Sequence, residues 1–261
     1  MNTLHIALIL LIPFSGTVLG SASALFLGQK SAAKMQNILL GFASGVMVAA
    51  AVWSLLIPAI EHTESTGGVG WVPAVVGFLG GMGFMLLLDM FTPHQHLDSP
   101  TPEGPTSSLG KSTMLMLAVT LHNIPEGMAV GVVVAGALSG QVDMSVAAVV
   151  ALAAGIALQN IPEGMVIIGP MLSVGLKPRK TFLIALLTGL VEVVGTFIGY
   201  FAVHAAAAIL PFALAFAGGT MLYVISDEMI PETHAHGGER GATYALLVGF
   251  CVMMVMDVLL G

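Results

Sequence analysis

Long apolar stretches alternate with short polar ones along the whole chain. Eight of these stretches are long enough to cross a membrane as a helix, which takes about 20 mostly apolar residues. Their expected bounds are residues 4–27, 35–60, 71–91, 112–138, 144–174, 181–204, 210–230 and 241–261. Repeated runs of this length are typical of membrane helices rather than of barrel strands. The pattern therefore predicts an all-α, polytopic membrane protein with eight transmembrane helices in a single domain, residues 1–261.

The composition agrees with this prediction and excludes several classes of protein. Hydrophobic residues make up 57% of the chain and charged residues 8%, whereas a soluble domain carries about 25% charged residues. The single cysteine, Cys251, excludes an internal disulfide and a cysteine-rich metal site. There is no basic patch, so no nucleic-acid partner is expected. The first apolar run has no Lys or Arg before it, which favours a retained helix over a cleaved signal peptide.

The basic residues predict how the chain crosses the membrane. All seven fall in the loops after the first, third, fifth and seventh stretches: Lys30, Lys34, Lys111, Lys177, Arg179, Lys180 and Arg240. Loops rich in Lys and Arg face the cytoplasm, so both termini are expected outside, with the chain in the cytoplasmic (inner) cell membrane. One of these loops, residues 92–111, holds four prolines together with His94 and His96. We expect it to be a flexible, histidine-containing cytoplasmic loop.

Two similar hexapeptides interrupt the fourth and fifth apolar stretches. They are His122-Asn123-Ile124-Pro125-Glu126-Gly127 and Gln159-Asn160-Ile161-Pro162-Glu163-Gly164. Residues four apart share a face of an α-helix, so His122 and Glu126 point the same way, as do Gln159 and Glu163. Each proline lacks an N–H and frees the carbonyl four residues before it. Because the two helices would run in opposite directions, the motifs predict an inverted-repeat arrangement around a site at the membrane midplane.

Three glutamates, Glu126, Glu163 and Glu192, lie in the middle of apolar stretches that contain no Lys or Arg. A charged side chain at this depth costs about 2.5–3.5 kcal/mol or more. These acids must therefore be protonated, hydrated or paired with a mobile cation. Protonated glutamates that are hydrogen-bonded between helices are the structural alternative. Three acids together with His122 and two asparagines favour a cation site.

The paired Asn-x-Pro-Glu-Gly motifs resemble those of the ZIP family of divalent-metal transporters, in particular its bacterial GufA-like branch. The resemblance covers essentially the whole chain and implies a binuclear metal site. It assigns one metal to His122, Glu126, Gln159 and Glu163, and a second metal to Asn123, Glu126, Asn160, Glu163 and Glu192. Gln159 stands where many members have His, and Asn160 where some have Asp. Both side chains are neutral, which leaves the preference among zinc, iron, manganese, cobalt and cadmium open.

Acids and histidines near the cytoplasmic ends of the third and seventh stretches resemble the family's exit route. They are Asp89, His94, His96, Asp227, Glu228, Glu232 and His234. Ordinary solvation at the membrane interface is the alternative interpretation. Of the other polar residues, Ser54 is expected to make a hydrogen bond between helices. Asp257, four residues from the outer end of the last stretch, is expected to extend to the interface.

The sequence thus predicts a transporter, and not an enzyme, that moves divalent transition metals, foremost zinc, into the cytoplasm. Its partners would be these metal ions, bound as substrate rather than as a cofactor, and the lipid bilayer; the resemblance also implies a homodimer. An intramembrane zinc metalloenzyme is the alternative function, and it would need about three strong ligands and a water-activating base. A non-transporting scaffold would leave the buried acids unexplained.

Overall fold

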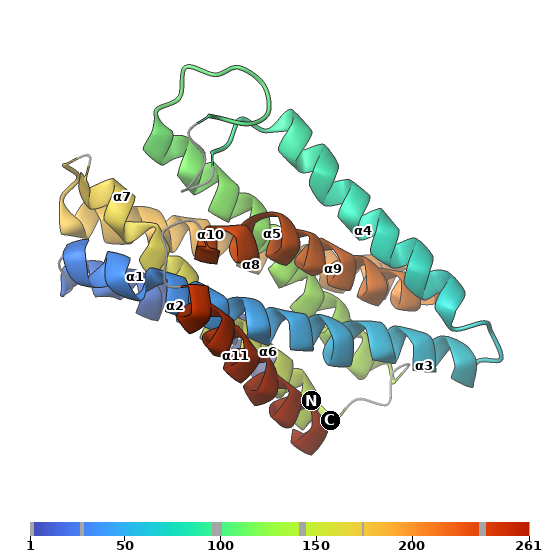
Figure 1. Cartoon of the computed structure of the whole chain (residues 1–261). Coiled ribbons are helices and arrows are strands. Elements are labelled where there is room, and N and C mark those ends of the chain that lie inside the picture. Colours follow the sequence, from blue (N-terminus) through green and yellow to red (C-terminus); the bar gives the residue numbers. More distant parts are fainter. Residues whose placement is uncertain are drawn as a thin grey trace.

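The computed structural model describes residues 3–26, 29–95, 101–140, 145–173, 175–234 and 239–260. Within these ranges the regular elements are helical, apart from one isolated β-bridge between His94 and Glu103. In chain order (Figure 1) they are α1 (Thr3–Ala22), η1 (Ser23–Leu25), α2 (Gln29–Ala50), η2 (Ala51–Leu56), α3 (Ile57–Ser65), α4 (Trp71–Phe91), α5 (Lys111–Ser139), α6 (Val146–Val166), α7 (Ile168–Ser173), α8 (Pro178–Ala205), η3 (Ala207–Ile209), α9 (Leu210–Val224), η4 (Ile225–Met229), α10 (Ile230–His234) and α11 (Glu239–Leu260).

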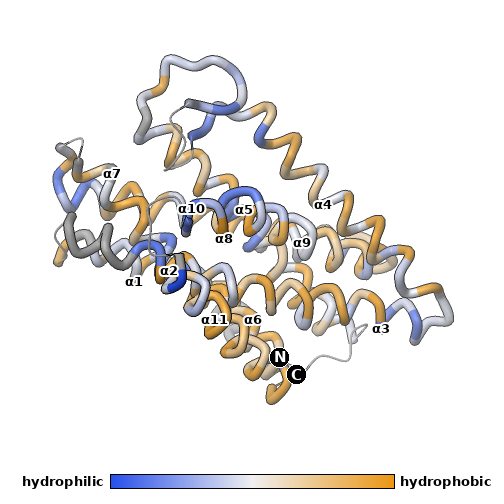
Figure 2. The backbone as a smooth tube through the Cα atoms, in the orientation of Figure 1, coloured by the Kyte–Doolittle hydropathy of each residue, from blue (hydrophilic) through white to orange (hydrophobic). Residues whose placement is uncertain are grey.

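Seven helical segments of the described chain are long and apolar enough to cross a membrane. They are Gln36–Ser65, Trp71–Phe91, Ser112–Ser139, Val146–Val166, Pro178–Ala205, Ala207–His234 and Arg240–Leu260. In addition α1 has 20 residues, of which Ile9–Ala22 form a shorter apolar helix. Seven of the predicted stretches overlap these segments, and the first overlaps α1. The second and seventh helices run on to Ser65 and His234, and the fifth stretch is divided into α6 and α7. Hydrophilic residues are concentrated in the described part of the loop between α4 and α5 and near α10, while the helices are largely apolar (Figure 2).

Two of the long segments contain a π-helical stretch. One is η2, between α2 and α3, and the other is η4, between α9 and α10. A π turn closes i→i+5 hydrogen bonds and holds one residue more than an α turn; such turns are rare and often lie at functional sites. Ser54 is buried on η2 and Glu228 is buried on η4. Both π turns therefore carry a buried polar side chain.

The helices pack most closely as four pairs: α5 with α8, α2 with α11, α4 with α9, and α1 with α6. Glycines bring the two backbones of each pair together. A Cβ on Gly127 of α5 would lie 1.9 Å from the carbonyl oxygen of Glu192 on α8. A Cβ on Gly16 of α1 would lie 2.0 Å from the carbonyl oxygen of Ala157 on α6. Small residues that let helix backbones touch are a usual means of association in membranes.

We group these pairs into two sets of helices for the description that follows. The first helix set consists of α1, α5, α6 and α8; the second helix set consists of α2–α3, α4, α9–α10 and α11. The two sets also contact each other, chiefly α2 with α6 and α5 with α9. The described glycines that approach the backbone of another helix all do so within one set. At the boundary between the sets, Gly155 of α6 instead meets the flexible side chain of Met253 on α11, with its sulfur nearest. The backbones are thus in tight contact inside each set, and this boundary glycine meets a side chain instead.

Candidate metal centre

The residues of the two hexapeptides lie in the first helix set. We call seven residues the polar seam: His122, Asn123 and Glu126 on α5, Gln159, Asn160 and Glu163 on α6, and Glu192 on α8. Six of them are at most 9% exposed, and Glu163 is partly buried. Both α5 and α6 run through their internal prolines as helices. The structure therefore places all seven predicted ligands on three helices of one set.

The glycines of the motifs explain why these helices meet at the glutamates. Gly127 follows Glu126 and packs against the backbone of Glu192, which brings α5 onto α8 at this level. Gly164 follows Glu163 and faces the backbone of α1, where a Cβ would lie 3.0 Å from the carbonyl oxygen of Thr17. Any larger residue at position 127 would separate α5 from α8. The Pro-Glu-Gly sequence thus combines a buried acid with the close approach of a neighbouring helix.

The two asparagines bind neighbouring helices through their amide nitrogens. Asn123 Nδ2 donates to the carbonyl oxygen of Thr188 on α8 over 3.0 Å. Asn160 Nδ2 lies 2.9 Å and 2.8 Å from the two carboxylate oxygens of Glu192, and 3.2 Å from the carbonyl oxygen of Pro13 on α1. The amides therefore hold α5 and α6 in place against α8 and α1.

Glu126 differs from Glu192 in its contacts. Both of its carboxylate oxygens, and the amide oxygen of Gln159, are buried without a hydrogen-bond partner among the described residues. Its polar neighbours are Gln159, Glu163 and Glu192. A buried acceptor left without a partner costs about 1–3 kcal/mol, and more when it is charged. A cation with a preference for oxygen ligands would satisfy these atoms.

The seam mixes carboxylates with neutral amides. Across the described residues, no group of three or more His, Cys, Asp and Glu side chains lies close enough together to hold a metal ion. A cation bound in this arrangement takes amide oxygens or water as part of its coordination shell. Such a shell suits borderline and hard divalent cations and is weaker than one of imidazoles and thiolates. This donor set suits a cation that is bound reversibly.

His122 connects the seam to the second helix set. Its Nε2 lies 2.5 Å from a carboxylate oxygen of Glu228 on η4. A cavity of about 50 Å³ adjoins this ion pair, and its polar lining consists of His122, Glu163, Glu228 and Glu232. This volume holds more than one water molecule. Polar groups therefore continue from the seam toward the end of α10.

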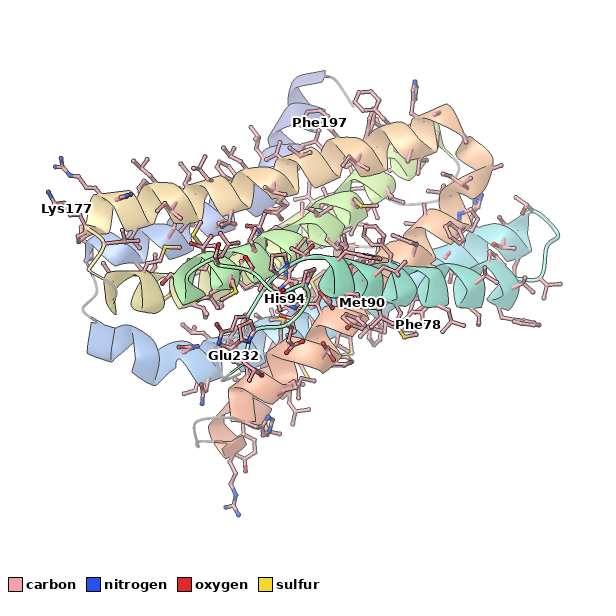
Figure 3. All side chains as sticks on the ribbon, turned by 90° about the horizontal axis from the view of Figure 1, so that it is seen from above. Phe78, Met90, His94, Lys177, Phe197 and Glu232 are labelled. Carbon is pink, nitrogen blue, oxygen red and sulfur yellow. The ribbon has the colours of Figure 1, made fainter. Side chains whose placement is uncertain are left out.

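Asp89 and His94 are also found close to this route. Asp89 Oδ1 lies 3.9 Å from His94 Nε2, and its other polar neighbours include Tyr223 and Glu228. His94 is only 1% exposed. Its backbone pairs with that of Glu103 in both directions, and its Nδ1 lies 2.8 Å from the carbonyl oxygen of Thr92. The start of the loop after α4 thus folds over the bundle, where Figure 3 labels His94 and Glu232 well away from Lys177.

The other predicted exit-route residues behave differently. Asp227 and His234 are exposed, because successive helix residues point in different directions and their neighbours Glu228 and Thr233 take the buried positions. His96 lies outside the described residues. Glu232 is partly buried and accepts a hydrogen bond of 2.8 Å from Gln36 Nε2 on α2. Of the seven candidates, the structure therefore gathers Asp89, His94, Glu228 and Glu232.

Asp257 corrects a prediction from the sequence. It does not extend to the interface: it is 8% exposed and accepts a hydrogen bond of 2.6 Å from Ser54 Oγ. The close packing of α11 on α2 turns this acid inward. The same contact confirms the predicted hydrogen bond of Ser54 between helices.

Some contacts of the site could not be found by sequence reasoning. The carbonyl oxygens of Pro13 and Thr188 accept hydrogen bonds from seam residues, and a backbone acceptor has no signature in a sequence. Tyr223 and Gln36 are single polar residues in helices, and no motif or periodicity of the sequence distinguishes them from other polar residues.

Comparison with known proteins identifies the family. The family model described as "ZIP Zinc transporter" matches residues 94–257. Over 252 residues the chain is 36% identical to the zinc transporter ZIPB of Bordetella bronchiseptica, covering 95% of this chain and 79% of the relative. It is 41% identical to the zinc transporter GufA of Myxococcus xanthus, covering 80% and 81%, and 32% identical to the human zinc transporter ZIP11, covering 94% of each. The chain therefore belongs to the ZIP zinc transporter family.

Proposed function

We propose that this protein carries divalent transition-metal cations, foremost zinc, through the membrane and into the cytoplasm. The observation that carries the proposal is Glu126, whose two carboxylate oxygens are buried without a hydrogen-bond partner among the described residues. Glu163 and Glu192 are its charged neighbours, and the apolar stretches that form these helices contain no Lys or Arg. A mobile cation is the partner that such acids need. The relatives, which are named zinc transporters, support zinc as this cation.

The polar seam is the proposed transport site. His122, Glu126, Gln159 and Glu163 are proposed to supply an imidazole nitrogen, two carboxylates and an amide oxygen to the cation. Because no three His or Glu side chains of the described residues lie close enough together to hold a metal ion, these side chains must approach one another when the cation binds. Asn123, Asn160 and Glu192 lie beside them and fix the geometry through hydrogen bonds to α8 and α1. The cation is substrate and not a resident cofactor. Because a transported cation must be released, we expect a weak, mixed coordination shell rather than the closed shell of a structural metal.

The exit route is proposed to run from Glu163 along the cavity beside Glu228 and Glu232. Asp89 and His94 stand close to Glu228 on the same side. Carboxylates spaced along a narrow path offer a leaving cation successive partners, so it need not be released into an apolar surrounding. The loops with Lys and Arg are proposed to be cytoplasmic by the positive-inside rule, which places both termini outside.

Two further features belong to this proposal. Eight transmembrane helices, with the two motifs related as an inverted repeat, make the protein a multi-pass component of the cell membrane. The helices α4 and α11 are the least covered of the described spans, with 22% and 17% of their apolar windows buried. Their outer faces are available to lipid or to a second copy in a homodimer. The alternative of an intramembrane metalloenzyme gains no support from relatives that are named transporters.

The test is zinc uptake into sealed vesicles that contain the purified protein and a zinc-sensitive dye inside. We expect the wild type to accumulate zinc, and Glu126→Gln to lose at least about 90% of the rate. This loss corresponds to about 1.4 kcal/mol or more of lost stabilisation. Glu64→Gln is the matched control, because Glu64 is an exposed glutamate near the end of α3. Wild-type vesicles that accumulate no more zinc than empty ones would refute the proposed function.

A further inference from the structure

Asn160 occupies the part of the seam that the resemblance assigns to a second metal. Its amide nitrogen lies 2.9 Å and 2.8 Å from the two carboxylate oxygens of Glu192. Both residues are 1% exposed, so water does not compete for these contacts. The carboxylate of Glu192 thus already has a donor across both of its oxygens. The two carboxylate oxygens of Glu126, by contrast, have no hydrogen-bond partner among the described residues.

The orientation of this amide follows from its third contact. The same nitrogen lies 3.2 Å from the carbonyl oxygen of Pro13, which can only accept a hydrogen bond. The group facing Pro13 and Glu192 is therefore the NH₂ and not the amide oxygen. The oxygen of Asn160 lies on the other side, 3.4 Å from Gln159 Nε2. Turning the amide over would set its oxygen against two acceptors at once.

The backbone of α1 holds Pro13 in this position. Gly16 and Gly20 let α1 lie directly on α6, where a Cβ would come within 2.0 Å of the carbonyl oxygen of Ala157 and 2.2 Å of that of Ile161. Asn160 lies between these two contacts in the sequence of α6. The acceptor that orients its amide is therefore part of a rigid helix pair and not of a mobile side chain.

We propose that the amide of Asn160 takes the place of a second cation, so that the seam carries one divalent ion at a time. An amide N–H partners the charge of Glu192, as a bridging metal ion would do in a binuclear site. An aspartate at position 160 would place a second carboxylate against Glu192, and two carboxylates in contact require a cation or a proton between them. The inference rests on the proposed function, since it counts the ions of the proposed transport site.

The experiment counts zinc bound to purified protein and removes the contribution of other sites by subtraction. Zinc per chain is measured by mass spectrometry after equilibrium dialysis. The measurement is repeated in a background that carries Glu126→Gln, Glu163→Gln and Glu192→Gln, so that no glutamate of the seam remains. The difference between the two values is the number of ions that depend on the seam. We expect a difference of one for the wild type and of two when Asn160→Asp is introduced into both proteins.

Asn37→Asp is the matched control, because it adds the same charge on α2, outside the seam. It leaves the contact between Asn160 and Glu192 as it is, so the difference should stay at one. A difference of two in the wild type would overturn the inference and leave the proposed transport site intact. A difference that stays at one in Asn160→Asp would also overturn it. A difference of zero in the wild type would refute the transport site itself.

Discussion

Gln159 stands in the polar seam with an amide oxygen that no described donor reaches. Beside it, Glu126 is in the same situation, whereas Glu192 receives an N–H from Asn160. Two glutamates of the same seam, Glu126 and Glu192, thus have different roles. The oxygens without donors are those that a cation can use directly. The bonded ones maintain the spacing of the helices.

Gln159→His should shift the preference of the transporter toward zinc. Imidazole is a better ligand for zinc than for manganese, whereas an amide oxygen discriminates little between the two. We expect the zinc-to-manganese ratio of initial uptake rates to rise severalfold. The two rates are measured in parallel on the same vesicles. An unchanged ratio would show that residue 159 does not contact the transported ion.

Zinc binding at the seam should weaken as the pH falls. The ligating forms are carboxylates and neutral imidazole, so protons compete with the metal and leave when it binds. Free imidazole titrates near pH 6.5, so we expect the affinity to fall steeply from about pH 7.5 to about pH 5.5. Calorimetry in buffers of different ionisation enthalpy measures the released protons. A binding enthalpy that is independent of the buffer, with a flat affinity, would contradict this expectation.

The helices themselves were largely predictable from the sequence. Runs of about 20 apolar residues identify the membrane helices, and the four-residue spacing of His122 and Glu126 places both side chains on one face of a helix. Two features could not be predicted. The π turns η2 and η4 add a residue that no periodicity reveals, and Asp257 turns inward only because α11 packs on α2. Both depend on contacts between helices, which a single apolar run does not encode.

Gly127→Ala should destabilise the protein, because the new Cβ would lie 1.9 Å from the carbonyl oxygen of Glu192. The backbone of α8 would have to move, at a cost of about 1–3 kcal/mol for overpacking. Gly83→Ala is the control, since nothing lies within 4 Å of its Cβ position on α4. Thermal unfolding in detergent should show a lower Tm for Gly127→Ala alone. Equal Tm values for both variants would mean that α5 and α8 tolerate a wider separation.

At the scale of the whole molecule, the seam lies entirely in the first helix set. Asp89, Glu228 and Glu232 of the proposed exit route lie in the second helix set. Glycines join backbones inside each set, while at the boundary Gly155 meets the side chain of Met253. A carrier must expose its site to each side of the membrane in turn. We expect this movement to occur at the boundary between the sets, where no described glycine brings two helix backbones into contact.

A disulfide across the boundary should therefore stop transport. Gly155 and Met253 replaced by Cys provide the crossing pair, with Cys251 changed to Ser in all proteins. Thr17 and Gly189 provide the control pair inside the first helix set, where a Cβ on Gly189 would lie 2.9 Å from Thr17 Cβ. Oxidation should abolish zinc uptake for the crossing pair, reduction should restore it, and the control pair should transport in both states. Full uptake by the oxidised crossing pair would locate the movement elsewhere.

The ion pair between His122 and Glu228 has a consequence for how an empty carrier differs from a loaded one. The imidazole Nε2 of His122 contacts a carboxylate oxygen of Glu228, and this contact needs a proton between the two atoms. A cation that binds this nitrogen takes the place of that proton, so the direct contact between His122 and Glu228 is lost. We expect the pair to hold the two helix sets together in the empty carrier and to open when the cation binds. Loading the seam and loosening the boundary between the sets would then be a single event.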